Sequence, residues 1–193
     1  FSGLSQVFSH LALFASTNPE DILSRIQNVD VVMTNKVKLD AAVLQQCPKL
    51  KLILISATGT NNVDLAQARA QGIVVCNCQG YGTAAVAQHT LMLMLNLATS
   101  FLKYDRAVRD GKWQQAQQFC LLDFPISELS GKTLGIVGFG ELGQAVAKLA
   151  EAFGMKILVA QLPNRPSVQG RMALDELLSQ VDLYLTPLYI TTS

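Results

Sequence analysis

Apolar residues along the chain form short continuous runs that alternate with segments in which they recur at helical spacing. Four of these runs predict strands: Val29–Thr34, Leu50–Ile55, Ile73–Asn77 and Met155–Ala160. The run Leu50–Ile55 is nearly continuous in apolar residues, as buried parallel strands are. Strands that alternate with helices form parallel sheets joined by right-handed crossovers. The pattern therefore predicts an α/β fold.

The segments between the runs predict helices with recognisable ends. Leu39–Cys47 is predicted as one short helix. Leu65–Gln71 is predicted as another, with Asp64 as its N-cap and Gly72 as its left-handed stop. A long helix is predicted from about Thr83 to Arg109.

The long helix and the segment after it separate two sets of strands. We therefore predict two α/β domains with a boundary near residue 100. Residues 1–100 form the first, whose N-terminus is expected to be incomplete because Phe1 is not a native start. Residues 101–193 hold about half of the second, so its C-terminal half is expected to lie beyond the chain.

A glycine-rich turn follows a further apolar run that begins at Thr133. Its pattern is Gly138-x-Gly140-x-x-Gly143, and a segment of helical period comes directly after it. Gly138 permits a tight turn, Gly140 lets backbone approach a pyrophosphate, and Gly143 lets helix and strand pack closely. A plain structural turn is the alternative, but the strand, the helix and the second strand at βαβ distance favour dinucleotide binding.

The start of the helix after this turn is predicted to hold phosphate. Its free N–H groups, which include those of Glu141 and Leu142, and the positive end of the helix dipole favour an anion there. An acidic side chain near a pyrophosphate repels it, so we expect the Glu141 side chain to point to solvent and leave binding to the backbone.

Composition excludes several function classes. Half of the 193 residues are hydrophobic, and 15 basic against 14 acidic residues give a net charge of +1, so no electrostatic footprint for nucleic acid is present. The longest apolar run, near Leu91–Ala98, is too short to span a bilayer and is predicted to be a buried helix. We therefore expect neither a nucleic-acid partner nor a membrane.

The four cysteines show no metal-binding spacing with the two histidines, so no metal site is predicted. Small buried cysteines in a reducing cytosol are the interpretation that we favour, and no signal peptide is recognised. Together these features predict a cytoplasmic protein.

Several stretches resemble the D-isomer-specific 2-hydroxyacid dehydrogenases, and the resemblance covers nearly the whole chain. The family is indicated by three of them: Ser56–Asp64, Gly72–Asn77 and Gly131–Gly138. Four others look most like its glycerate dehydrogenase (hydroxypyruvate reductase) branch: Gln79–Thr83, Val86–Thr90, Phe119–Pro125 and Gly140–Gly143.

The resemblance implies two doubly wound parallel-sheet domains, a flavodoxin-like substrate domain and a Rossmann nucleotide-binding domain. It implies an oxidoreductase that moves a hydride between NAD and a small 2-hydroxy or 2-keto acid, with hydroxypyruvate/D-glycerate or glyoxylate/glycolate favoured. Phosphoglycerate or a bulkier 2-keto acid remains an alternative, although the loops at Thr58 and Tyr81 lack the basic residues that a phosphate calls for. A dinucleotide-sensing protein, like the corepressors of this fold, is a further alternative.

The catalytic residues of the family are expected outside the chain. In the family an arginine binds the substrate, and a histidine paired with a glutamate exchanges the proton. The resemblance places all three beyond residue 193. The only histidines here, His10 and His89, are interpreted as structural, so we expect the chain by itself to be inactive.

The resemblance assigns the substrate carboxylate to the loop Ala57-Thr58-Gly59, where adjacent backbone amides can bind an anion. Thr58 also matches a position that in relatives touches the nicotinamide end of the cofactor. An ordinary strand-to-helix turn is the alternative. Tyr81 shapes the substrate pocket or is a surface aromatic, and Thr83 can be the N-cap of its helix.

Gln161 stands where the family usually has an acidic residue that binds the ribose hydroxyls of NAD. Without that carboxylate, and with Arg165 close by, a 2′-phosphate is not repelled, so NADP is an alternative cofactor. Thr186 is expected to contact the cofactor as well. The stretch from Asp182 to Pro187 is shorter than in relatives, and a deletion and an irregular chain end are equal interpretations.

The segment 84–104 is apolar over more than one face, which predicts burial on several sides. In relatives the equivalent helix lies in the dimer interface, so the resemblance implies a homodimer. Burial between two domains of one subunit is the alternative.

Overall fold

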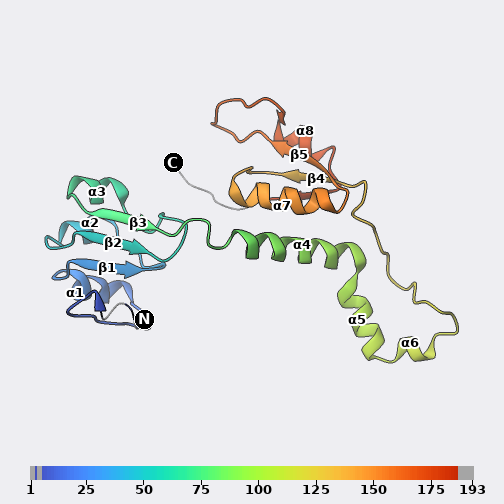
Figure 1. Cartoon of the computed structure of the whole chain (residues 1–193), viewed down its shortest axis with the longest axis horizontal. Coiled ribbons are helices and arrows are strands. Elements are labelled where there is room, and N and C mark those ends of the chain that lie inside the picture. Colours follow the sequence, from blue (N-terminus) through green and yellow to red (C-terminus); the bar gives the residue numbers. More distant parts are fainter. Residues whose placement is uncertain (1–2, 4–5, 187–193) are drawn as a thin grey trace. The chain divides into compact units, whose positions relative to one another are not determined.

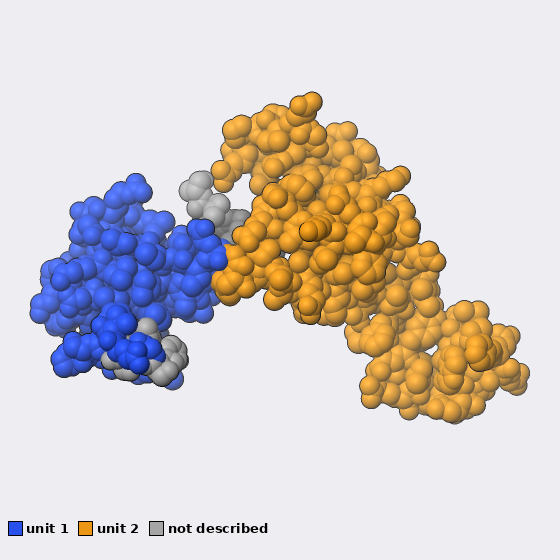
Figure 2. Space-filling view, viewed as in Figure 1, with its two compact units in different colours: residues 1–79 blue, residues 80–193 orange. Residues whose placement is uncertain are grey.

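Two compact units make up the chain, and they divide after Gln79 (Figure 2). The structure is a computed structural model that describes residue 3 and residues 6–186. The division falls earlier than the boundary predicted near residue 100. The reason is that helix α4 (Thr83–Thr99) packs against helix α7 (Glu141–Ala152), which belongs to the second unit.

The first unit contains a three-stranded parallel sheet in the order β1-β2-β3 (Figure 1). Its strands are β1 (Val31–Thr34), β2 (Leu52–Ile55) and β3 (Val74–Asn77), and they lie within three of the predicted runs. Because all three run in the same direction and in register, their carboxyl ends lie at one edge of the sheet.

Short helices surround this sheet: η2 (Pro19–Asp21), α1 (Ile22–Ile26), α2 (Ala41–Gln45) and α3 (Leu65–Ala70). The predicted ends of α3 are confirmed. The Asp64 carboxylate accepts a hydrogen bond from the Gln67 amide at 2.9 Å, and Gly72 has a φ of +73°. The 3-10 helix η2 and the helix α1 were not predicted.

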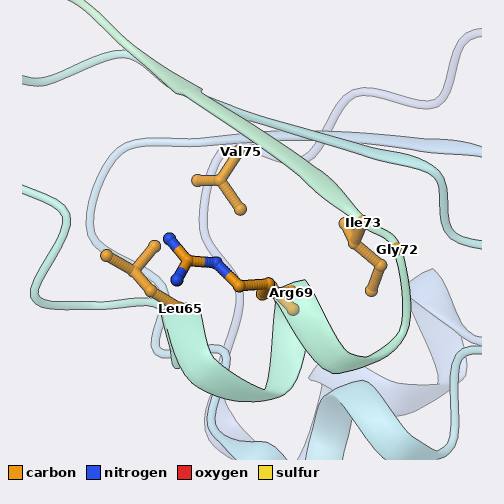
Figure 3. Close-up of a pocket in the computed structure, with 6 residues that line it drawn as sticks. Leu65, Arg69, Gly72, Ile73 and Val75 are labelled. Carbon is orange, nitrogen blue, oxygen red and sulfur yellow. The ribbon is translucent and has the colours of Figure 1, made fainter.

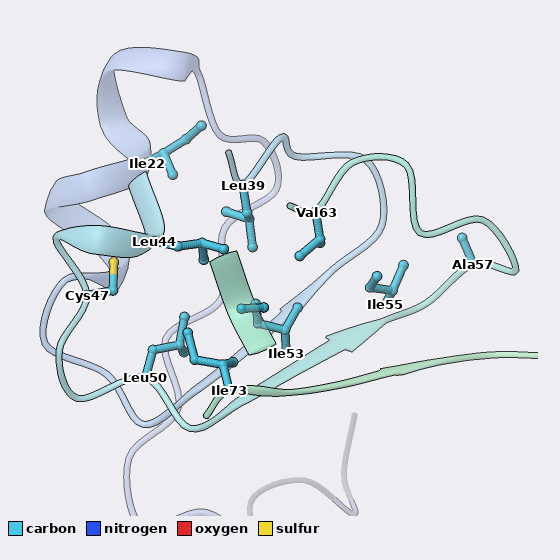
Figure 4. Packing of buried hydrophobic residues seen from close by; sticks show 11 residues of the cluster. Ile22, Leu39, Leu44, Cys47, Leu50, Ile53, Ile55, Ala57, Val63 and Ile73 are labelled. Carbon is cyan, nitrogen blue, oxygen red and sulfur yellow. The ribbon is translucent and has the colours of Figure 1, made fainter. Parts of the chain in front are cut away.

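Aliphatic side chains from the sheet and from the segments around it form the core of the first unit (Figure 4). Four of them are almost fully buried: Leu39, Leu44, Ile53 and Ile55. Cys47 is buried with them, and this burial raises the pKa of its thiol. Cys76, Cys78 and Cys120 are exposed, so the prediction of buried cysteines is wrong for these three.

The second unit holds a four-stranded parallel sheet in the order β6-β5-β4-β7 (Figure 1). Its strands are β4 (Thr133–Ile136), β5 (Lys156–Ala160), β6 (Arg171–Met172) and β7 (Leu183–Leu185). The helices that accompany α4 and α7 are α5 (Phe101–Arg109), α6 (Lys112–Gln115) and α8 (Leu174–Leu178). Two all-parallel sheets confirm the predicted α/β fold class.

The prediction of one helix from Thr83 to Arg109 is wrong, because the chain breaks at Ser100. Ser100 has a φ of +51°, and α4 and α5 are bent by 65° there. The Ser100 hydroxyl donates to the carbonyl of Pro125 at 2.8 Å, and the Ser127 amide donates to the carbonyl of Ala98 at 2.8 Å. These long-range hydrogen bonds satisfy polar groups at the break. Hydrophobic periodicity could not predict them, because it reflects only the local spacing of apolar residues.

Among the described residues, no single helix has the length and apolar composition to cross a bilayer. Helices α4 and α5 reach that threshold only when they are counted together across their bend.

Helix α4 packs one face on the core of the second unit, and several apolar residues on the rest of its surface are exposed. Ala87 and Met94 pack in a core with residues of β4 and α7. Apolar side chains elsewhere on α4 and α5 are exposed to solvent, among them Leu93, Leu97, Phe101 and Leu102. The burial predicted on several sides of the 84–104 segment is therefore not reached among the described residues.

Asp182 ties the start of β7 to the start of β4. Its carboxylate accepts hydrogen bonds from the Thr133 amide at 2.8 Å and from the Lys132 ammonium at 3.1 Å. These donors, the Thr133 amide first, hold the pKa of the Asp182 carboxyl below its ordinary value. A carboxyl with a lowered pKa stabilises the fold above its unfolded pKa, and this contribution is lost as the pH falls through the folded value.

We predict that Asp182→Asn lowers Tm at pH 7, because it removes the charge that strengthens these hydrogen bonds. The difference from the wild type should be constant above about pH 5 and should vanish towards about pH 2. Thermal unfolding followed by circular dichroism over this range measures it, with the exposed Glu128→Gln as control. A Tm difference of equal size at both ends of the range would contradict the prediction.

Candidate functional site

The order of strands in the second unit places a switch point at β4. In chain order β4 comes first, β5 and β6 lie successively on one side of it, and β7 lies on the other. In open α/β sheets, ligands bind beyond the carboxyl ends of the strands where the order reverses in this way. The predicted glycine turn leaves the carboxyl end of β4, so it lies at the position where this fold binds ligands.

Gly138 and Gly143 serve the packing of this turn. Gly138 has a φ of +107°, which side chains disfavour, as expected for a tight turn. Gly143 is buried, and a Cβ there would overlap the carbonyl oxygen of Gly138. Helix α7 can therefore approach β4 this closely only with glycine at position 143.

Gly140 differs from both, because its backbone borders open space. A Cβ built at Gly140 meets no protein atom within 4 Å. Gly140 is also the N-cap of α7 and offers no side chain to the first amides of that helix, which include those of Glu141 and Leu142. The open backbone and the free amides of a 12-residue helix fit the pyrophosphate of a dinucleotide.

Glu141 is exposed, but its side chain does not simply point to solvent. Its Oε1 accepts a hydrogen bond of 2.6 Å from the hydroxyl of Thr83, at the start of α4. Gly80 lies close by with a φ of +70°, and a Cβ there would stand 3.2 Å from the same oxygen. The carboxylate is thus held against the start of α4. Thr83 is not the N-cap of α4, which is Gly82.

The predicted substrate loop follows β2 in the first unit. Ala57 is buried, and its carbonyl accepts a hydrogen bond from the Cys78 amide at 3.1 Å. The side chain of Asn77 donates to the carbonyl of Thr58 at 2.6 Å, a contact that sequence reasoning missed. In the part of the chain that is described, neither the Thr58 nor the Gly59 amide donates a hydrogen bond. The loop is therefore held by its carbonyls, and two amides remain available.

Tyr81 is the second residue of the second unit, and its side chain is 71% exposed. Of the two interpretations, the exposed position matches a surface aromatic, and a role in a pocket stays a prediction. The other predicted substrate residues belong to the first unit. The predicted site residues thus form two groups, one around Thr58 in the first unit and one around the glycine turn in the second unit.

Gln161 follows β5, and its side chain is turned into its own loop. The amide nitrogen donates to the carbonyls of Leu162, Arg165 and Pro166 at 3.1, 3.2 and 3.1 Å. The amide oxygen accepts from the Val168 amide at 3.1 Å. This arrangement differs from the expected ribose contact, because the polar atoms of Gln161 are already bonded within the chain.

Thr186 lies next to the glycine turn, as the prediction of a cofactor contact requires. It directly follows β7, and the carbonyl of Leu185 accepts a hydrogen bond from the Val137 amide at 2.9 Å. The Thr186 side chain is exposed. The rest of the irregular end, from Pro187 onwards, lies outside the described residues.

The histidines do not contribute to either group. His10 and His89 are exposed, and within residue 3 and residues 6–186 neither ring makes a hydrogen bond. No cluster of metal-ligating side chains occurs over the same residues.

A separate hollow lies beside α3 in the first unit (Figure 3). It is lined by Leu65, Ala68, Arg69, Gly72, Ile73 and Val75, and it contains none of the predicted site residues.

The strand order and the glycine turn give the second unit the architecture of a Rossmann-type fold. A family model described as D-isomer specific 2-hydroxyacid dehydrogenase, catalytic domain, matches residues 4–191. The chain therefore belongs to the D-isomer-specific 2-hydroxyacid dehydrogenase family.

Two curated relatives illustrate which members of the family this chain is similar to. A glycerate dehydrogenase of Methylorubrum extorquens is 43% identical over 165 residues, which are 86% of this chain and 52% of the relative. A hydroxypyruvate reductase of Blautia hydrogenotrophica is 39% identical over 171 residues, which are 86% of this chain and 53% of the relative. The chain thus spans about half the length of the curated relatives that it matches.

Solved structures of similar fold contain nicotinamide cofactors. An acyclic imino acid reductase in complex with NADPH and D-Arg has a TM-score of 0.75 at 26% identity, over 89% of this chain and 55% of that one. A 3-phosphoglycerate dehydrogenase of Entamoeba histolytica with bound NAD⁺ has a TM-score of 0.66 at 26% identity, over 92% of this chain and 52% of that one. Proteins related to this chain thus bind both forms of the cofactor.

The two glycines of the turn should respond differently to the same substitution. We predict that Gly143→Ala lowers Tm by about 5–10 °C, because its methyl group overlaps the Gly138 carbonyl. Gly140→Ala should leave Tm within about 2 °C of the wild type but weaken NADH binding at least about ten-fold, because the methyl group occupies the open space. Thermal unfolding and fluorescence titration with NADH measure the two effects. Equal losses of Tm would contradict the distinction.

The hydrogen bond from Thr83 predicts a dependence of cofactor binding on the Glu141 charge. In Thr83→Val the carboxylate loses its anchor and can turn towards the pyrophosphate, so we expect the Kd for NADH to rise about three- to ten-fold, most at low salt. The double variant Thr83→Val/Glu141→Gln should recover the wild-type Kd, because the side chain at position 141 then carries no charge to repel the pyrophosphate. Equal weakening in the single and double variants would show that Thr83 acts in some other way.

Proposed function

We propose that the intact protein containing this chain is an NAD(P)-dependent dehydrogenase that reduces hydroxypyruvate to D-glycerate or glyoxylate to glycolate. The observation that carries this proposal is the open backbone at Gly140, at the switch point of a Rossmann-type sheet, in a member of this family. Relatives at 43% and 39% identity are named glycerate dehydrogenase and hydroxypyruvate reductase, which supports the choice of substrate.

Each group of residues has a defined task in this proposal. The amides of Thr58 and Gly59 bind the substrate carboxylate, and the exposed Tyr81 lies against its hydroxymethyl group. The amides at the start of α7 hold the pyrophosphate, while Thr83 keeps the Glu141 carboxylate aside. The bound cofactor supplies the hydride. We assign the proton transfer to no residue of this chain.

Oxidation of NAD(P)H by the intact protein, followed at 340 nm, tests the substrate class. We predict that kcat/KM for hydroxypyruvate or glyoxylate exceeds that for phosphohydroxypyruvate at least about ten-fold, because the loops at Thr58 and Tyr81 carry no basic residue to pair with a phosphate. A protein that ends at Ser193 should show no turnover. Tight NADH binding without turnover by the intact protein would favour a dinucleotide-sensing binding protein instead.

We propose that the intact protein uses both NADH and NADPH as hydride donors. No acidic residue stands at position 161 to repel a 2′-phosphate, and the Arg165 side chain nearby is exposed. The values of kcat/KM for NADPH and NADH are therefore expected to lie within about ten-fold of each other. A hundred-fold preference for NADH would overturn this part of the proposal.

A homodimer is proposed as the assembly. Helices α4 and α5 and the segment after α6 expose large apolar side chains, among them Leu97, Leu102, Phe119 and Leu122. Large apolar side chains exposed on neighbouring segments of the chain support an interface with a second copy. Sedimentation equilibrium of the intact protein should give a dimer, and Leu97→Glu/Leu102→Glu should give monomers. The exposed Leu13→Glu of the first unit is the matched control.

The proposal places the protein in the cytoplasm. All four cysteines are free in the structure, and three of them are exposed, which suits a compartment that keeps thiols reduced.

A further inference from the structure

The loop of residues 162–168 is built around the side chain of Gln161. Three carbonyls of this loop accept hydrogen bonds from its amide nitrogen, and the Val168 amide donates to its amide oxygen. One side chain thus bonds to four points along seven residues. The backbone of Gln161 is fixed as well, because its amide donates to the carbonyl of Met172 on β6 at 2.7 Å.

The loop has little other internal support. Residues 163–168 are all exposed, so no apolar side chain anchors this part of it in the core. Pro163 followed by Asn164 with a φ of +58° is typical of a type II turn, and Pro166 restricts the backbone again. The prolines limit the conformations of the loop, and among the described residues the side-chain amide of Gln161 bonds to both of its ends, at Leu162 and at Val168.

The loop lies where the cofactor's adenosine ribose is expected. It leaves the carboxyl end of β5, the strand that pairs with β4. In this fold the residue at that end contacts the 2′ substituent of the ribose. Gln161 occupies that position, yet its polar atoms face the loop. The exposed Arg165 guanidinium is the nearby cation, and it forms no ion pair with a carboxylate among the described residues.

We infer that Gln161 is a positioning residue: it fixes the 162–168 loop as the wall that meets the ribose 2′ substituent, and it does not contact the ribose itself. This inference rests on the proposed function. It makes the loop backbone and Arg165 the groups that accept either a 2′-hydroxyl or a 2′-phosphate.

Substitution by glutamate separates this role from the usual one. In a site where residue 161 binds the ribose directly, Gln161→Glu would restore the familiar carboxylate and strengthen NADH binding. Here the carboxylate would face three carbonyl oxygens to which it cannot donate. The loop would open, and binding of both cofactors would weaken.

Hydrogen exchange and cofactor titration on the intact protein test the inference together. The variants are Gln161→Glu and Gln161→Met, and Gln169→Glu is the matched control, because Gln169 is exposed and its side chain makes no hydrogen bond within the described residues. In both Gln161 variants we expect the Val168 amide to exchange at least about ten-fold faster, and the Kd for NADH and NADPH each to rise about ten-fold. The control should change neither.

Three outcomes would overturn the inference: tighter NADH binding by Gln161→Glu, unchanged exchange at Val168, or faster exchange with unchanged affinity for both cofactors. Failure of the proposed function would look different. In that case the wild-type protein would bind neither dinucleotide, whereas the exchange rate at Val168 would still show whether Gln161 holds the loop.

Discussion

The second unit depends on the close approach of α7 to the turn that leaves β4. Gly143 touches the carbonyl of Gly138, and no larger residue fits between them. This contact sets the direction of α7, and α7 in turn supplies the surface on which α4 packs. It also aims the first amides of α7 beyond the carboxyl end of β4, where the strand order reverses. Fold and proposed phosphate site thus share one steric constraint.

Polar side chains then refine this site by bonding within the chain. Glu141 would repel a pyrophosphate, but Thr83 holds its carboxylate at the start of α4. Gln161 would be a natural ribose ligand, but its amide is used to close the 162–168 loop. In both cases the side chain next to the proposed ligand shapes the site through a neighbour, because a hydrogen bond inside the protein fixes its direction.

Much of the fold could be predicted because its signals are local. The apolar runs at Leu50–Ile55 and Ile73–Asn77 gave the strands, and Asp64 and Gly72 gave the ends of α3. The break at Ser100 could not be predicted, since it is stabilised by Pro125 and Ser127, which lie far along the chain. The early end of the first unit has the same cause, because the packing of α4 on α7 joins distant segments.

The sequence by itself determined the fold class, the family, the turn at Gly138 and the close packing at Gly143, because backbone conformation and hydrophobic burial depend on residue type and spacing. Only the tertiary structure decided which way the side chains of Glu141 and Gln161 turn. Spacing predicted that both residues lie near the expected cofactor but could not show their hydrogen-bond partners. A side-chain hydrogen bond is directional, and its partner is chosen by the folded chain.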